Sequence, residues 1–453
     1  MKQRKRVSTL MKKGKYEAVL LFWMAFPVIA YSQNPISPPG VYIADPAARV
    51  WKDGKLYVYG SVDESPDHYC SSRHHVLSTD DMLSWTLHEN VFSSQGEGDA
   101  VPYSDAVLFA PDCMYCDGKY YLYYNMPAPG AIAGVAVSAS PTGRFLKGEK
   151  IDLYGKAQID PAIFVDDDGT AYYIWGQFNA KMAELNPDRM TIDPATIKDR
   201  VLTEKEHYFH EGGAMIKRNG IYYFIYAHIG RANMPTAIGY STSTSAMGPY
   251  QHGGIIVDND HCDPEVWNNH GSIAEFNGKW YVFYHRSTHG SESMRKACVE
   301  PIYFNEDGSI PEVEMTSQGA GPPLAAEDIT EAERACLLHG NVRIEKLSDD
   351  NECLAKIQNG DRAVYKYVDL SGHPQRISMR VLPGGRKSTI RICLDSPWSK
   401  PVATIQVPAR NDGNEWITSH AEVSNAAGVH ALWIVFSVEP KDELSCDWFR
   451  FSK

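Results

Sequence analysis

The chain has 453 residues, of which 43% are hydrophobic, and it carries a formal net charge of -12 at pH 7. This length exceeds that of most single domains, and the acidic balance without any basic stripe excludes a nucleic-acid-binding role. The nine cysteines are too sparse for a disulfide framework. Cys113-Met114-Tyr115-Cys116 has metal or redox spacing but no second pair, so we assign these cysteines a structural role.

A basic segment followed by an apolar one begins the chain. Seven Lys and Arg residues between Lys2 and Lys15 precede an apolar stretch of thirteen residues, Ala18 to Ala30. Thirteen residues are too few to span a membrane comfortably, and Ala30-Tyr31-Ser32 fits a cleavage site of small residues. Residues 1–32 are therefore predicted to be a signal peptide, with an uncleaved anchor as the alternative. Cleavage would leave a secreted or periplasmic protein without a membrane attachment.

Five copies of one phrase, a glycine-containing turn followed by aromatic and β-branched residues, recur in the first three hundred residues. The copies occupy residues 53–59, 117–124, 168–175, 219–226 and 277–284, and their glycines are 51 to 64 residues apart. Asp-Gly and Asn-Gly turns next to such strands are typical of β-hairpins, and hairpins repeated at a fixed phase are typical of a β-propeller. We predict an all-β chain in which residues 33–315 form a five-bladed β-propeller.

A second all-β unit is predicted nearer the C-terminus. Residues 316–326 begin with the small, turn-forming stretch Thr316 to Pro323, which favours a linker. Alternating apolar residues then recur at 363–368, 377–381, 389–394, 403–407 and 431–436. Short strands at this spacing are typical of a β-sandwich, and we predict one of the jelly-roll kind over residues 327–453.

Three acidic residues share one position in the repeat, nine residues before the turn glycine. They are Asp45 in the first copy, Asp160 in the third and Glu211 in the fourth, whereas the second and fifth copies have Phe109 and Asn269 there. A single Asp-Pro is an ordinary turn or strand-entry device. Three acids at one phase of a radial repeat are instead predicted to converge on its axis.

Such a set of carboxyl groups suits the hydrolysis of a glycosidic bond. One carboxylic acid protonates the leaving oxygen, while a carboxylate activates water or attacks the sugar. These two groups need opposite protonation states at one pH, and a third carboxylate beside the acid raises its pKa by like-charge repulsion. Aromatic side chains around the acids would offer stacking faces for sugar rings. The sequence therefore predicts a glycosidase whose substrate is an oligosaccharide or polysaccharide.

Residues 36–310 resemble family 43 glycoside hydrolases. The resemblance is carried by Ala44-Asp45-Pro46, Ile159-Asp160-Pro161-Ala162, His210-Glu211-Gly212, Phe109-Ala110-Pro111-Asp112 and Asn269-His270-Gly271-Ser272-Ile273. It implies an inverting mechanism in which Asp45 is the general base and Glu211 the general acid. Asp160 would then tune the pKa of the acid and fix its orientation.

The same resemblance implies further site residues and a class of substrate. His270 would help to hold a calcium ion or a water cluster at the axis, and Arg286 would reach the floor of the funnel to bind substrate. Phe109 stands where a tryptophan is more usual and would stack on a sugar ring. The implied substrates are α-L-arabinofuranosides or β-D-xylosides, with galactans in some members, and no organic cofactor is implied. The long segment 61–105 favours a closed pocket and exo action.

Two other functions stay open at this point. In a retaining, fructan-cleaving propeller Asp45 would be a nucleophile, although that group usually has asparagine where this chain has Ala44. In a lectin-like propeller the site would bind sugar without cutting it. The intact set of three acids argues against the second alternative.

The C-terminal unit resembles a family 6 carbohydrate-binding module. The resemblance is carried by Ile329-Thr330-Glu331-Ala332-Glu333, the segment around Trp416, Gly428-Val429-His430 and Cys446-Asp447-Trp448-Phe449-Arg450-Phe451. It implies that Glu331, Glu333 and Asp447 hold a structural calcium ion, for which oxygen ligands are suited. Trp398 and Tyr365 are candidates for binding sugar, with packing in the core or at an edge as the alternative.

Overall fold

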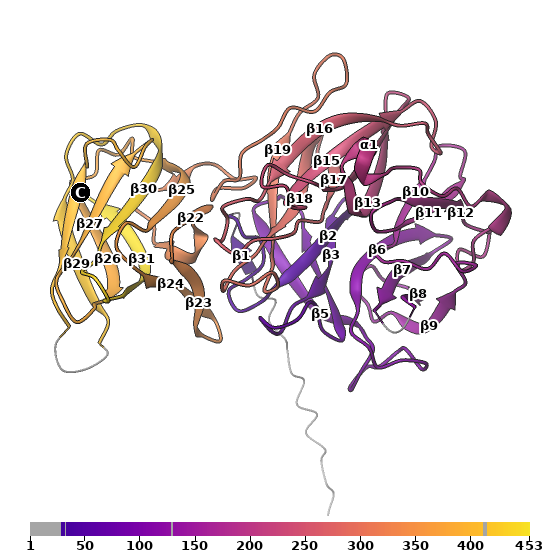
Figure 1. The fold of residues 1–453 in the computed structure, drawn as a ribbon, viewed down its shortest axis with the longest axis horizontal. Coiled ribbons are helices and arrows are strands. Elements are labelled where there is room, and N and C mark those ends of the chain that lie inside the picture. Colours follow the sequence, from indigo (N-terminus) through magenta and orange to yellow (C-terminus); the bar gives the residue numbers. More distant parts are fainter. Residues whose placement is uncertain (1–28, 32, 128–129, 411–414) are drawn as a thin grey trace, which may run out of the picture.

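The computed structural model describes residues 29–31, 33–127, 130–410 and 415–453. These residues form two β-rich units that lie next to each other, a larger one that ends with β19 (Lys296–Ile302) and a smaller one that starts with β20 (Leu324–Ala325) (Figure 1). Helical structure in the described residues is limited to α1 (Glu204–His207) and the short 3₁₀ turns Pro194–Thr196 and Ala332–Arg334. The predicted all-β class is therefore confirmed.

The larger unit consists of five antiparallel sheets, one for each copy of the repeated phrase. The first sheet contains β1 (Ile29–Tyr31), β2 (Ile43–Val50), β3 (Leu56–Val62), β4 (Arg73–Thr79) and β5 (Ser84–Ser93). The second contains β6 (Phe109–Cys116), β7 (Lys119–Met126), β8 (Ile132–Ser138) and β9 (Leu146–Ile151), and the third β10 (Ala162–Val165), β11 (Ala171–Trp175) and β12 (Lys181–Glu184). The fourth contains β13 (Phe209–Arg218), β14 (Ile221–His228), β15 (Ala237–Ser243) and β16 (Gln251–Asp258), and the fifth β17 (Ser272–Phe276), β18 (Lys279–Arg286) and β19. These sheets are the five predicted blades.

The glycine of each repeated phrase sits in the hairpin between the first two strands of its blade. Gly54 has φ 81° and Gly220 has φ 77°, and a Cβ atom added at either would meet nothing within 4 Å. The requirement at these turns is therefore for positive φ, which glycine meets without steric cost, and not for space. The shared conformation explains why the glycine recurs at one phase of the sequence.

Aromatic residues of the repeated phrases fill the space between neighbouring blades. Tyr59 of the first blade packs in one cluster with Leu122 and Tyr124 of the second. Tyr123 lies on the other face of the same strand and packs with Tyr173 of the third blade. Because successive side chains of a strand point to opposite faces, each middle strand contributes to two interfaces. The aromatic runs are therefore what joins the blades into one body.

The smaller unit is a sandwich of two sheets. One contains β20, β22 (Leu337–His339), β25 (Arg362–Asp369), β27 (Ser388–Leu394), β28 (Ala403–Val407) and β30 (Val429–Ser437). The other contains β21 (Thr330–Glu331), β23 (Arg343–Ser348), β24 (Asn351–Ile357), β26 (Arg376–Leu382), β29 (Ile417–Glu422) and β31 (Leu444–Ser452). Their inner faces enclose one apolar core, which includes Tyr365, Met379 and Phe436. All five alternating segments noted in the sequence form strands.

The segment predicted as a linker is packed between the two units. Thr316 and Ser317 are buried. The Thr316 hydroxyl donates to Glu300 Oε2 at 2.7 Å, and the amide of Ser317 donates to the carbonyl of Lys366 at 2.6 Å. β20 also lies within the predicted linker, where it pairs with β25. The small residues of segment 316–326 thus reflect close packing more than freedom of movement.

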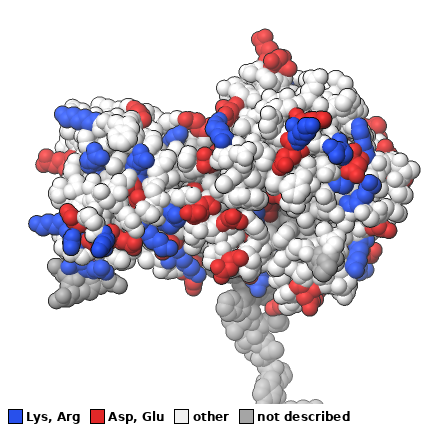
Figure 2. Space-filling view, viewed as in Figure 1, with Lys and Arg blue, Asp and Glu red and all other residues white. Residues whose placement is uncertain are grey.

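Two further features of the molecule are its surface charge and the state of its cysteines. Figure 2 shows basic and acidic side chains intermixed over the face in view. All nine cysteine thiols are free, including Cys113 and Cys116. No helix in the described part of the chain has the length and apolar character needed to cross a membrane. The predicted signal peptide falls outside the described residues, except for β1, which pairs with β5.

Candidate active site

The three acids at the shared repeat position all lie where the strand geometry is interrupted. Asp45 has φ 53° and sits where the pairing of β2 with β3 shifts register, and Asp160 has φ 61° immediately before β10. Glu211 lies between two register shifts in the pairing of β13 with β14. Such irregularities turn a side chain away from the pleat and are frequent next to active sites. Each acid therefore sits at a break in regular strand geometry, Asp45 and Glu211 at register shifts and Asp45 and Asp160 at positive φ.

The three carboxyl groups line one cavity of about 250 Å³. Phe109 and His270 line it as well, so five of the predicted propeller site residues are brought together. The remaining walls come from Tyr69, Cys70, Ile159, Gln177, Trp267, Asn268 and Arg295. Apolar and aromatic groups thus alternate with carboxyl, amide and guanidinium groups, a combination typical of sites that bind a sugar.

Asp45 is held as a carboxylate by three neighbours. Its Oδ1 atom accepts a hydrogen bond of 2.9 Å from Arg295 Nη1, and its Oδ2 atom accepts one of 2.7 Å from the Ser61 hydroxyl. His270 Nδ1 lies 3.5 Å from Oδ1. Burial alone would raise the pKa of Asp45, but the charges of Arg295 and then His270 outweigh it and hold the pKa well below its usual range. An ionised carboxylate is the form that a general base requires.

Asp160 is in the opposite protonation state. Burial makes the largest contribution and, together with the charges of Glu211 and Asp45, raises the pKa of Asp160 to about 8. Glu211 Oε2 accepts a hydrogen bond of 2.7 Å from Gln177 Nε2. One cavity therefore contains a carboxylate beside Arg295 and, in Asp160 and Glu211, two carboxyl groups that hold a proton between them at neutral pH. Such a pair can supply the proton for acid–base catalysis while Asp45 stays ionised.

His270 carries a positive charge between the acids. Burial alone would lower the pKa of His270, but the carboxyl groups of Asp45, Asp160 and Glu211 raise it to about 9. Its ring packs against Gly212, where an added Cβ atom would lie 2.5 Å from His270 Nε2. The glycine after Glu211 is therefore needed for this close approach as well as for its φ of 58°.

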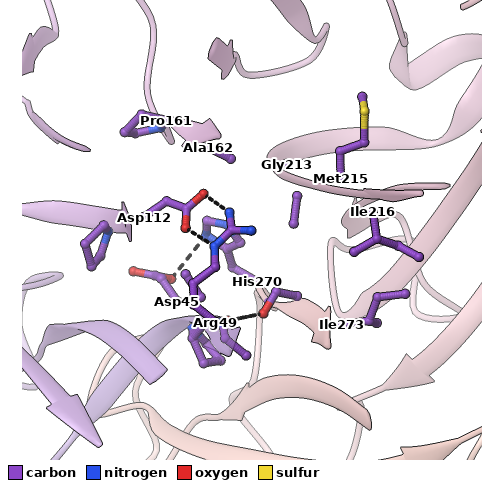
Figure 3. A pocket seen from close by; sticks show the side chains of 17 residues that line it. Asp45, Arg49, Asp112, Pro161, Ala162, Gly213, Met215, Ile216, His270 and Ile273 are labelled. Carbon is purple, nitrogen blue, oxygen red and sulfur yellow. Dashed lines mark hydrogen bonds and ion pairs between the residues drawn. The ribbon is translucent and has the colours of Figure 1, made fainter. Parts of the chain in front are cut away.

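An ion pair joins three blades next to the cavity. Arg49 Nε donates to Asp112 Oδ1 at 2.8 Å, and Arg49 Nη2 donates to the other carboxylate oxygen (Figure 3). Arg49 Nη2 also donates to the carbonyl of Ile163 at 2.8 Å. The amide of Ile163 returns a 2.7 Å hydrogen bond to Asp112. These contacts link β2, β6 and β10 next to Asp45 and His270, which Figure 3 shows at the same small cavity. The pair thus fixes the strands that carry Asp45 and Asp160.

The prediction for Arg286 is wrong in its placement. Its guanidinium donates to the Tyr284 hydroxyl at 2.8 Å and to the carbonyl of Thr316, away from the cavity. Strand alternation explains the difference, because the preceding residue, His285, is the one that faces Asp45, with its Nδ1 atom 3.7 Å from Oδ1. The basic group in the cavity is Arg295.

Several residues of the site were not predicted from the sequence, although the repeated phrase could have indicated three of them. The residue seven positions after the turn glycine lies within one residue of the end of the strand that follows the turn. In three blades it contacts an acid: Ser61 and His285 reach Asp45, and Asn125 Oδ1 accepts from the amide of Asp160 at 3.1 Å. The other missed residues, Tyr69, Cys70, Gln177, Trp267 and Arg295, lie outside the repeated phrases. No periodicity could have identified those five.

The predicted calcium sites gain no support from the arrangement of side chains. Among the described residues there is no group of three or more His, Cys, Asp or Glu that could hold a metal ion. In the sandwich Asp447 is paired with Arg380 and accepts from Asn351 at 3.0 Å. Calcium therefore stays a prediction.

The other two predicted ligands in the sandwich differ in their surroundings. Burial and then the charge of Asp447 raise the pKa of Glu331, which pairs in the sheet with Trp448, the residue after Asp447. Burial raises the pKa of Glu333 to about 8, and its Oε2 atom is buried without a hydrogen-bond partner. The unpartnered oxygen is the one observation here that fits a ligand.

The two candidate sugar-binding aromatics of the sandwich have opposite environments. Tyr365 is fully buried in the sandwich core, where its hydroxyl donates to the carbonyl of Ala332 at 2.7 Å. It therefore has no face for a ligand, and of the two alternatives left open for Tyr365, packing in the core is the one that the structure shows. Trp398 is 83% exposed and lies 5.9 Å from the guanidinium of Arg362. An aromatic ring this exposed is available to a sugar.

Comparison with known proteins agrees with this geometry. Residues 32–310 match the model of glycosyl hydrolases family 43, and residues 331–453 match the model of carbohydrate binding module family 6. A xylosidase/arabinosidase of Thermoclostridium stercorarium is 28% identical over 473 residues, covering 89% of this chain and 95% of the relative. A xylosidase/arabinosidase of Bacteroides ovatus is 31% identical and covers 61% and 96%, respectively.

Solved structures show the same similarity. A family 43 arabinoxylan arabinofuranohydrolase of Bacillus subtilis, in complex with cellotetraose, is 26% identical, with a TM-score of 0.52 over 93% of this chain and 98% of that one. A family 43 β-xylosidase/α-arabinofuranosidase from a compost microbial metagenome, in complex with xylotriose, is 29% identical, with a TM-score of 0.53 over 63% and 99%. The chain therefore belongs to glycosyl hydrolases family 43 and is a glycoside hydrolase on a five-bladed β-propeller, in a family for which inversion is characteristic.

Proposed function

We propose that this enzyme removes terminal α-L-arabinofuranosyl or β-D-xylosyl units from plant polysaccharides or their oligosaccharides. One observation carries the proposal: Asp45, Asp160 and Glu211 line a single cavity of about 250 Å³. A cavity of this size suits about one sugar unit, which favours exo action. The names of the relatives, xylosidase/arabinosidase and arabinoxylan arabinofuranohydrolase, support the choice of sugar.

In the proposed mechanism Asp45 takes a proton from the attacking water. Arg295 and Ser61 keep its carboxylate ionised and oriented, so that water is activated on one face of the sugar. Glu211 donates a proton to the leaving oxygen on the other face, with its carboxyl group oriented by Gln177. Asp160 and Glu211 repel each other when both are ionised, so the two groups together hold a proton at neutral pH, and Glu211 is the one that delivers it. Attack by water in a single displacement inverts the anomeric centre.

The test is hydrolysis of aryl α-L-arabinofuranosides, aryl β-D-xylosides, xylotriose and arabinoxylan oligosaccharides, with NMR of the first product anomer. Glu211→Gln and Asp45→Asn should each lower kcat by about 10²–10⁴-fold. Glu275→Gln, at an exposed position of β17, is the matched control and should behave as the wild type. Because aryl groups leave easily and mask the loss of an acid, the natural oligosaccharides decide the role of Glu211. Unchanged turnover by either site variant refutes its role, and a retained anomer refutes the proposed inversion.

The proposal also includes export of the enzyme, sugar binding by its C-terminal module and a bound calcium ion. The basic and apolar segments before residue 32 support export of the enzyme. The exposed ring of Trp398 supports sugar binding by the C-terminal module. The partnerless oxygen of Glu333, close in sequence to Glu331, supports a calcium ion at that end of the sandwich. A calcium titration followed by thermal unfolding of the full chain tests the last of these, and no shift in melting temperature would reject it.

A further inference from the structure

A buried ion pair crosses from the sandwich to the propeller. Glu352, on β24 of the sandwich, is 0% exposed and pairs with Lys296, the first residue of β19. Its Oε1 atom accepts a 2.7 Å hydrogen bond from the hydroxyl of Tyr42, which belongs to the propeller. Both partners of Glu352 are themselves buried. A carboxylate in this environment needs all of these contacts, so the two units are held in one geometry at this point.

The residue next to Lys296 reaches the active site. Arg295 donates to Asp45 Oδ1 at 2.9 Å and to both carboxylate oxygens of Asp63, at 2.9 and 3.0 Å. Successive side chains on an extended segment point to opposite sides. Lys296 therefore faces the sandwich while Arg295 faces the cavity. Two adjacent residues thus connect Glu352 of one unit with Asp45 of the other.

The loop before β19, residues 287–295, makes a second set of contacts with the sandwich. The amide of His289 donates to the carbonyl of Ile344 on β23 at 3.1 Å. Gly290 packs so closely on the side chain of Arg343 that an added Cβ atom would lie 2.7 Å from its Nε atom. Arg343 also reaches Glu265 of the propeller, at 3.4 Å. One end of the loop therefore rests on β23.

The other part of this loop supports the wall of the cavity. The Glu292 carboxylate accepts a 3.0 Å hydrogen bond from the Tyr69 hydroxyl. The carbonyl of Glu292 accepts one of 3.1 Å from Asn268 Nδ2. Tyr69 and Asn268 both line the cavity. The loop is thus in contact with the sandwich on one side and with two cavity-lining side chains on the other.

We infer that the β-sandwich positions the catalytic machinery: Glu352 and Arg343 hold loop 287–295, through which Arg295 is kept against Asp45 and Tyr69 and Asn268 are kept around the substrate. Glu352 and Arg343 are positioning residues and do not touch the substrate. The inference rests on the proposed role of Asp45 as the general base. It assigns the C-terminal unit a part in turnover that is separate from any sugar binding by its own surface.

The expected signature is a fall in kcat that exceeds any change in KM. Arg295 donates to Asp45, the proposed base, so a loosened Arg295 acts on the chemical step more than on sugar binding. A sandwich that only stabilised the fold would change the melting temperature and leave the kcat of the folded enzyme in place.

The experiment compares Glu352→Gln with Glu345→Gln in the full chain. Glu345 lies on the neighbouring strand and pairs with Lys356 near the surface, and no hydrogen bond joins its side chain to loop 287–295 among the described residues. We expect Glu352→Gln to lower kcat about tenfold on xylotriose or arabinoxylan oligosaccharides, with a smaller change in KM. Glu345→Gln should match the wild type. Tyr42→Phe removes one hydrogen bond to Glu352 and should lower kcat by less.

The possible outcomes separate this inference from the proposed function. If Glu352→Gln does not fold, Tyr42→Phe decides the question by its kcat. Wild-type kcat in the folded variants, with or without a lower melting temperature, overturns the positioning role. Asp45→Asn in the same assay reports on the proposed function alone. Loss of turnover in that variant with a wild-type Glu352→Gln rejects only this inference, whereas retained turnover in Asp45→Asn rejects the function itself.

Discussion

Gln177 Nε2 donates a 2.7 Å hydrogen bond to Glu211 Oε2, and an isolated bridge between these residues joins the third blade to the fourth. The proposed proton donor is therefore oriented by the blade that carries Asp160. The contact lies in the cavity, so it acts on the face of Glu211 that the substrate meets.

Replacement of Gln177 tests this orientation. Gln177→Ala leaves Glu211 without its amide partner, and we expect kcat on natural oligosaccharides to fall by about tenfold, in line with the loss of about 1.4 kcal/mol of transition-state stabilisation. KM should change less than kcat, because the lost contact is with the enzyme's own acid. Steady-state kinetics against Gln318→Ala, a glutamine outside the cavity, provide the comparison. Equal kcat in wild type and Gln177→Ala would contradict the role.

The raised pKa of Asp160 predicts a basic limb of activity and an opposite effect on stability. The raised pKa of Asp160, about 8, results in part from repulsion by Glu211, so above that pH the two groups lose the proton that they share, and kcat/KM should decline because no proton is left for the leaving oxygen. In the unfolded chain Asp160 ionises near its ordinary value of 3.8. The folded state therefore binds the extra proton between these values, and its contribution to stability falls as pH rises through them.

Asp160→Asn should accordingly be more stable than the wild type at pH 8 and approach it near pH 4. The gain in the free energy of unfolding should exceed about 1 kcal/mol, since one unit of pKa is worth about 1.4 kcal/mol. Urea unfolding at the two pH values measures it. If Asp160→Asn is less stable than the wild type at pH 8, contacts of the Asp160 carboxyl group stabilise the fold more than its raised pKa destabilises it.

The sequence could predict the acids because they belong to the repeat, and it could not predict the groups that surround them. Asp45, Asp160 and Glu211 share a phase with a turn glycine whose positive φ is required in every blade. Arg295 lies in a loop outside that phase, and nothing in the sequence distinguished it from Arg286. One residue of strand alternation sends Arg286 away from the cavity.

The contact between the two units was equally hidden from the sequence. Lys296 and Glu352 are 56 residues apart and belong to separately recognisable folds. A charged residue on a strand is normally read as facing solvent, and only the packing of two units shows that both are buried. The small residues of 316–326 were misleading for the same reason, because close packing between domains and a free linker favour similar composition.

The exposed ring of Trp398 allows the function of the sandwich surface to be tested apart from catalysis. Trp398→Ala should weaken binding to insoluble arabinoxylan severalfold, because stacking on an aromatic ring is lost. Hydrolysis of a small aryl glycoside should be unchanged, since Trp398 does not line the cavity. Trp416→Ala is the comparison within the same unit, where the ring packs under Arg380 at 5.1 Å. Undiminished binding by Trp398→Ala would place the sugar site elsewhere.

Substitution of Gly212 tests the packing of His270 separately from backbone strain. Gly212→Ala would place a Cβ atom 2.5 Å from His270 Nε2 at a residue with φ 58°, whereas Gly220→Ala introduces a Cβ at φ 77° with nothing within 4 Å. The second variant should lose only the backbone preference, about 1 kcal/mol, and keep its activity. The first should lose more stability and most of its turnover, because His270 must move away from Asp45. Thermal unfolding and kcat measured side by side test this, and equal behaviour of the two variants would mean that the ring of His270 shifts without consequence for the acids.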